Sequence, residues 1–80
     1  MNIHAELLSA LCDLAIDTSQ ISGETRLKED LEMDSTERVE LALALEKRLS
    51  LSIDDAIFGK LSSFDEVEQY LQSLAGILVG

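Results

Sequence analysis

An amphipathic pattern opens the chain. Apolar residues separated by four, four and three positions fall at Ile3, Leu7, Leu11 and Leu14. This spacing places them on one face of a helix, so we expect a helix over residues 3–15. Cys12 lies within the same segment, and we expect its small apolar side chain to be buried or half-buried.

Residues 16–34 show no such period. Polar and small residues interrupt the segment, and isolated apolar residues are scattered through it, at Ile16, Ile21, Leu27, Leu31 and Met33. We interpret these apolar residues as anchors that hold a long loop against the core. A loop of this length is uncommon inside a compact domain and is usually functional or mobile.

The second helix has the clearest start. Asp34 can act as its N-cap, and Glu37, three residues further on, completes a capping box. Apolar residues at helical spacing follow, at Val39, Ala42, Leu43, Leu45 and Leu49. The run 41–45 is apolar on almost every side, so we expect this helix to be buried on more than one face and to end near Ser50.

A short helix is expected after the second one. Either Asp54 or Asp55 can cap a turn over residues 56–58, and Gly59 can close it. The sequence leaves open which of the two aspartates is the cap.

A second capping box, formed by Ser63 and Glu66, predicts the start of the last helix. Its apolar face consists of Val67, Tyr70, Leu71 and Leu74. Since no segment alternates with the period of a strand, the predicted fold class is all-α. We expect a four-helix bundle with three main helices, one short third helix and a long loop between the first two, in a single domain over residues 1–80.

The net charge of the chain restricts the classes of macromolecule that it can bind. Sixteen acidic residues against six basic ones give a net charge of -10, which disfavours nucleic acid and anionic membranes and favours proteins with basic surfaces. The single cysteine permits no internal disulfide. The N-terminus lacks a signal-peptide pattern, and no apolar run approaches the roughly 20 residues that span a bilayer. We therefore expect a cytoplasmic monomer without membrane insertion.

Catalytic and metal-binding constellations are missing from the sequence. One His and one Cys are too few for an ordinary zinc site, and no glycine-rich phosphate loop is present. A Ser-His-Asp arrangement would have to use His4, close to the N-terminus. We therefore expect that the chain is not an enzyme and that it has no metal site.

The densest polar feature is the segment 29–40, in which six acids surround the single cation Arg38. One interpretation is a solvated, well-capped helix start. A calcium loop is a second one, but it requires Gly and Glu where the chain has Ser35 and Leu41. The third interpretation places a phosphodiester on Ser35, in the first helical turn, where free backbone N–H groups and the helix dipole favour an anion.

This pattern resembles the acyl carrier protein family over nearly the whole chain. The matching residues around the serine are Leu27, Asp30, Leu31, Asp34, Ser35, Val39, Glu40, Leu41, Leu45 and Glu46. Further matches downstream are Leu51, Ile53, Asp55, Phe64, Val67, Tyr70 and Leu71.

The resemblance implies a four-helix bundle that carries acyl groups as thioesters on 4'-phosphopantetheine. The arm would be attached to Ser35, after Asp34, by a phosphopantetheinyl transferase that uses coenzyme A. Enzymes that load, elongate or transfer the acyl group in fatty acid or polyketide biosynthesis would be further partners, with basic docking surfaces.

The resemblance also assigns roles to other residues. The docking residues would be Glu32, Thr36, Glu37 and Glu40. The walls of an acyl cavity between the helices would be Leu41, Leu45, Ile53 and Ile57, although such residues are more often plain core.

Four departures from the family pattern point to a specialised pathway. The apolar end of the second helix is Leu49, and Lys47 and Arg48 precede it where acids are frequent. Thr36 replaces the apolar residue that commonly follows the modified serine, and Glu32 stands where Gly is common. The Pro often found before the third helix is missing, since the chain contains no Pro. We therefore favour a polyketide-like or other dedicated pathway over housekeeping fatty acid synthesis. The alternative function is an acidic helical protein-interaction domain that is never modified.

Overall fold

The computed structural model describes residues 2–79, with side chains for residues 2–76. Its helices are α1 (Ile3–Asp13), α2 (Ser35–Leu49), α3 (Asp55–Phe58) and α4 (Phe64–Val79). Within the described residues the only β-type pairing is an isolated bridge between Arg26 and Ser63. The predicted all-α class with a short third helix and a long first loop is confirmed.

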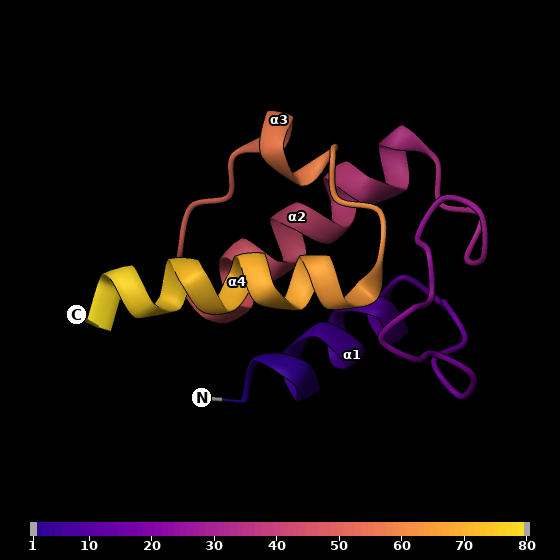
Figure 1. The fold of residues 1–80 in the computed structure, drawn as a ribbon, viewed down its shortest axis with the longest axis horizontal. Coiled ribbons are helices and arrows are strands. Elements are labelled where there is room, and N and C mark those ends of the chain that lie inside the picture. The colour runs from indigo at the N-terminus through magenta and orange to yellow at the C-terminus, as the bar shows by residue number, and fades with distance from the viewer. Residues whose placement is uncertain (1, 80) are drawn as a thin grey trace.

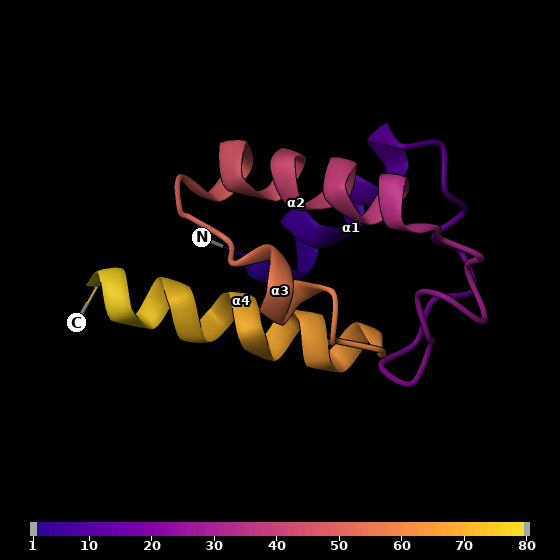
Figure 2. The ribbon, with the colours of Figure 1, turned by 90° about the horizontal axis from the view of Figure 1, so that it is seen from above.

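The three long helices lie side by side, and the short α3 lies at the edge of the bundle above α2 (Figure 1). The α2 and α4 helices run in the same direction, whereas α1 runs in the opposite direction. In Figure 1, α3 lies above the α2–α4 pair and α1 below it, and the view from above shows α3 between α2 and α4 (Figure 2). The long loop gathers at one end of the bundle, and the chain re-enters the helices there at the start of α2.

The core is aliphatic apart from two phenylalanines. Residues that are at most 2% exposed come from every helix and from the loop: Leu7, Ala10, Leu11, Leu27, Met33, Leu41, Ala42, Leu45, Leu49, Phe58, Phe64, Val67 and Leu71. Full burial of one such large side chain stabilises the fold by about 1.5–3 kcal/mol. Leu27 and Met33 therefore anchor the loop, as the sequence predicted, and fix the path that leads to α2.

The α1 helix ends two residues earlier than expected. Asn2 caps its start by accepting a hydrogen bond from the Ala5 amide at 3.0 Å. At the other end Ala15 takes a left-handed conformation with φ 62°, which cannot continue a right-handed helix. The prediction for Cys12 is wrong, because its side chain is exposed. It follows Leu11 by one position, so it points about 100° away from the buried face.

The expectation that α2 is buried on more than one face is also wrong. Its buried residues are Leu41, Ala42, Leu45 and Leu49, which share one face. Val39 and Leu43 remain 47% and 53% exposed on the other side. They stand four residues apart and lie outside the buried stripe of this helix.

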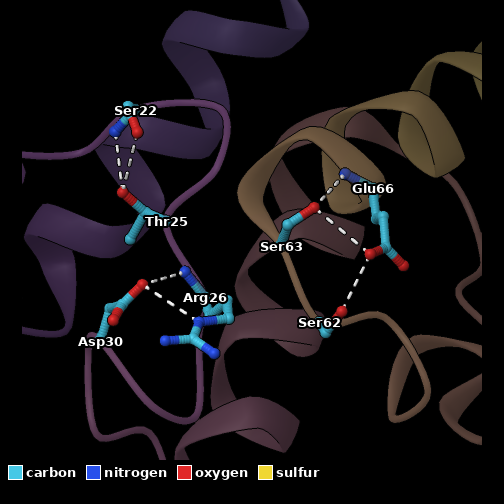
Figure 3. A network of polar contacts seen from close by, with 7 residues as sticks. All are labelled: Ser22, Thr25, Arg26, Asp30, Ser62, Ser63 and Glu66. Atoms are coloured by element: carbon cyan, nitrogen blue, oxygen red, sulfur yellow. Dashed lines mark hydrogen bonds and ion pairs between the residues drawn. The ribbon is translucent and has the colours of Figure 1, made fainter.

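Local caps fix the two remaining helix starts. Asp54 is the cap of α3, since its Oδ1 accepts hydrogen bonds from the Ala56 amide at 2.9 Å and the Ile57 amide at 3.2 Å. Before α4, Ser63 Oγ accepts a hydrogen bond from the Glu66 amide at 3.2 Å. The Glu66 carboxylate accepts from the hydroxyls of Ser62 and Ser63 in return, and so departs from the ideal capping box (Figure 3).

Backbone hydrogen bonds tie the long loop to the start of α4. The Leu27 amide donates to the Ser62 carbonyl at 2.9 Å, and the Phe64 amide donates to the Thr25 carbonyl at 2.8 Å. A third bond joins the Asp65 amide to the Gly23 carbonyl at 3.0 Å. Within the loop, Asp30 Oδ2 accepts a hydrogen bond from the Arg26 amide at 2.8 Å, beside Ser62 and Ser63 (Figure 3). These bonds hold together the two loops that flank the start of α2.

Candidate functional site

The start of α2 is built by the predicted capping box. Asp34 is the N-cap, and its Oδ1 accepts a hydrogen bond from the Glu37 amide at 2.8 Å. The Glu37 carboxylate accepts in return from the Asp34 amide at 3.4 Å. Ser35 is therefore the first residue of a fixed helical turn, and its side chain is exposed.

Two open pockets flank Ser35. The larger one has a volume of about 470 Å³ and lies between the start of α2, the long loop and the segment after α3. Its lining residues are Lys28, Glu29, Met33, Asp34, Ser35, Arg38, Gly59, Lys60, Leu61 and Ser62. The smaller pocket, of about 210 Å³, is bounded by α2 and α3 and includes Val39 and Phe58.

Arg38 separates the two pockets and belongs to the walls of both. Its Nη1 donates hydrogen bonds to the carbonyl oxygens of Gly59 at 2.7 Å and Phe58 at 3.4 Å. Its Nη2 donates to the Leu61 carbonyl. The Nε atom is buried and has no hydrogen-bond partner within the described residues. One guanidinium therefore holds the end of α3 against the first turns of α2.

The larger pocket is unexpectedly basic. Lys28, Arg38 and Lys60 account for three of the six basic residues of the chain, and Glu29 and Asp34 are the acids of the same wall. Sequence reasoning found the acids of this region and Arg38. It missed Lys28 and Lys60 because these residues lie in separate loops, and no sequence spacing connects them.

The predicted docking residues lie just before α2 and along its first two turns. Glu32, Thr36 and Glu40 are exposed, whereas Glu37 is half-buried and engaged in the cap. Glu32 has φ 56°, a left-handed conformation that favours Gly. Glu40 lies further along α2, at a third pocket shared with the end of α1.

The predicted acyl-cavity residues differ in how far they are buried. Leu41 and Leu45 are completely buried, Ile53 is 8% exposed and Ile57 is 45% exposed. None of them lines either pocket beside Ser35. Their role toward an acyl chain stays a prediction, and their observed role in the fold is that of core residues at Leu41, Leu45 and Ile53.

No metal centre is found in residues 2–79, where no group of three or more His, Cys, Asp or Glu side chains converges. None of the described helices is both long and apolar enough to cross a membrane.

Comparison with known proteins decides the family. A family model described as the phosphopantetheine attachment site matches residues 5–71. The chain belongs to the acyl carrier protein family. The carrier is 35% identical over 60 residues to the acyl carrier protein of Helicobacter hepaticus, which covers 75% of this chain and 79% of that protein. It is 32% identical over 63 residues to that of Thermotoga maritima, with coverage of 79% and 78%.

The fold of the carrier has a counterpart among solved structures. The solution structure of the 3,7-dioxo-octyl actinorhodin acyl carrier protein from Streptomyces coelicolor matches with a TM-score of 0.73. The match covers 95% of this chain and 88% of that chain, at 23% sequence identity. The carrier thus has the acyl-carrier fold. As a family member it carries acyl groups on phosphopantetheine and is not an enzyme.

Proposed function

We propose that Ser35 is the residue that bears the 4'-phosphopantetheine arm. The observation that carries this proposal is the exposed hydroxyl of Ser35 in the first turn of a capped helix, with an open pocket on either side. A transferase would remove the hydroxyl proton as Ser35 Oγ attacks the β-phosphorus of coenzyme A. The new phosphodiester forms as the pyrophosphate bond breaks, and adenosine 3',5'-bisphosphate leaves.

The residues at the start of α2 fit such a group. The amides of Ser35 and Thr36 lie in the first turn, where backbone N–H groups have no acceptor within the helix. The positive end of the helix dipole favours the negative phosphodiester there. The bound arm supplies a terminal thiol, which holds the acyl group as a thioester. The chain itself contributes the attachment point and the surface that enzymes recognise.

The docking surface in this proposal runs along the exposed side of α2. Glu32, Thr36 and Glu40 supply its polar part, and Glu37 contributes while it caps the helix. Val39 and Leu43 add exposed apolar area next to these acids. Such a combination suits the transferase and the acyl-loading, elongating or transferring enzymes, provided that they present basic residues around an apolar contact.

We retain three further parts of the proposal from the sequence. Thr36 and the strained Glu32 favour a dedicated, polyketide-like pathway over housekeeping fatty acid synthesis. A cytoplasmic monomer fits the net charge of -10 and the single cysteine. Leu41, Leu45 and Ile53 are buried and would contact an acyl chain if the helices separate, whereas Ile57 is already exposed.

Intact-protein mass spectrometry tests the attachment site. The protein is incubated with coenzyme A, magnesium and a broad-specificity phosphopantetheinyl transferase. We expect one added phosphopantetheine in the parent and in Ser52→Ala, and none in Ser35→Ala. Ser52→Ala is the matched control, because it removes an exposed serine hydroxyl outside the docking surface. A mass gain in Ser35→Ala would place the arm elsewhere. No gain in the parent, with a transferase active on another carrier, would favour the unmodified interaction domain.

A further inference from the structure

The cations of the larger pocket differ from the other arginines of the chain. Arg26 pairs with Asp30 at 3.6 Å, and Arg48 pairs with Glu6 at 3.7 Å and with Asp13. In the part of the chain that the structure describes, Lys28, Arg38 and Lys60 form no ion pair. In a chain with a net charge of -10, three such cations therefore line one pocket.

The local charge balance favours an added anion. Three cations and two carboxylates, those of Glu29 and Asp34, line the pocket and leave one surplus positive charge. Asp34 also uses one carboxylate oxygen to cap α2. A phosphodiester on Ser35, which lines the same pocket, brings one negative charge and balances the surplus.

The three cations come from different parts of the fold. Lys28 belongs to the long loop, Arg38 to α2 and Lys60 to the segment after α3. Arg38 is fixed by carbonyl oxygens, and Lys28 and Lys60 are exposed with flexible stems. The pocket therefore offers the fixed positive charge of Arg38, whose Nη groups are bonded to carbonyls, and two lysines that can move toward an anion.

We propose that Lys28, Arg38 and Lys60 form a binding site for the phosphodiester of the arm. This inference rests on the proposed attachment to Ser35. It directs the arm away from Ser35 over residues 59–62, into the larger pocket, and not along the apolar pocket of Val39 and Phe58. Arm attachment then draws the long loop and the segment after α3 toward the start of α2.

Lysine variants of the modified carrier test this site. Amide NMR spectra are recorded for the apo and holo forms of four proteins: the parent, Lys28→Gln, Lys60→Gln and Lys47→Gln. Mass spectrometry first verifies that each holo form carries the arm. Lys47 is the matched control, because it is an exposed lysine near the other end of α2. In the parent we expect arm attachment to shift the amides of residues 28–29 and 59–62. These shifts should fall at least twofold in Lys28→Gln and Lys60→Gln and stay unchanged in Lys47→Gln.

A stability measurement accompanies the spectra. We expect the arm to raise the melting temperature of the parent and of Lys47→Gln by roughly 2–4 °C, and to raise it less in Lys60→Gln. Two results would overturn the phosphate site and leave the attachment to Ser35 standing. One is a set of shifts confined to residues 34–36, and the other is a Lys28→Gln or Lys60→Gln variant whose shifts equal those of Lys47→Gln. Absence of any mass gain at Ser35 would overturn the attachment proposal and this inference with it.

Free coenzyme A provides the second source of phosphate. It is added to the apo carrier without a transferase, and we expect no saturable shift at residues 28–29 and 59–62. Saturable shifts at these amides would assign the pocket to the phosphates of free coenzyme A and contradict a site for the attached arm.

Discussion

Arg38 and Gly59 are joined by a 2.7 Å hydrogen bond from Nη1 of the guanidinium to the carbonyl oxygen. This bond links the first turns of α2 to the end of α3, a four-residue helix. A helix this short has little stability of its own and depends on tertiary contacts. Arg38 therefore fixes the wall that both pockets beside Ser35 share.

Replacement of Arg38 should loosen this wall. Arg38→Gln removes the charged donors to the carbonyls of Phe58, Gly59 and Leu61. We expect the free energy of unfolding of the apo carrier to fall by about 1.5–3 kcal/mol, as measured by urea denaturation. Amide hydrogen exchange in α3 should accelerate more than in α4. An unchanged exchange rate in α3 would show that the guanidinium does not hold this helix.

Replacement of Glu32 by glycine should stabilise the fold. The φ of 56° at Glu32 costs an L-residue about 1–2 kcal/mol, and glycine removes this strain. Glycine also loses more conformational entropy on folding, which offsets about 0.5–1 kcal/mol of that gain. We expect Glu32→Gly to raise the free energy of unfolding by about 0.5–1 kcal/mol. Glu32→Ala is the control, because it removes the charge and keeps the left-handed strain. An equal gain in both variants would attribute the effect to charge.

Glu66 should contribute stability that depends on pH. The hydrogen bond from the Ser62 hydroxyl, with a smaller contribution from Ser63, holds the pKa of Glu66 below its ordinary value. This stabilisation is complete above the unfolded pKa of about 4.5 and is lost as the pH falls through the lower folded pKa. The difference in unfolding free energy between the parent and Glu66→Gln should therefore shrink as acid is added below that value. A constant difference across this range would contradict the assignment.

The acidic docking surface should act through charge. Glu40→Lys reverses an exposed charge on α2, so we expect the KM of the transferase for the carrier to rise about 3–10-fold with little change in kcat. The KM of the parent should also rise with ionic strength, because salt screens the encounter. Glu24→Lys, an exposed change in the long loop, is the matched control. Equal effects of the two variants would point to net charge and not to α2.

The positions of the helices and their caps follow from the sequence, because they depend on neighbours. Asp34 and Glu37 stand three residues apart, and a capping box needs no more than this spacing. Asp54 likewise caps α3 through the next residues of the chain. The motif around Ser35 is equally local, so the sequence alone determined the family and the candidate attachment residue.

The tertiary structure decided which helix faces are covered. Cys12, Val39 and Leu43 fit an apolar helix pattern, yet all three are exposed. Helical periodicity gives the direction of a side chain from its own axis, but it does not say whether another helix packs against that side. The sequence pattern therefore predicts Val39 and Leu43 as core residues, whereas the fold leaves them on the surface.

The basic pocket is the other feature that only the fold decided. Lys28, Arg38 and Lys60 lie in a loop, a helix and a second loop, and they meet because backbone bonds tie the long loop to the start of α4. Their charges act through space, whereas their separation along the chain carries no period or motif. The sequence thus determined the helices, the caps and Ser35, and the packing of the loops determined the electrostatic surroundings of that serine.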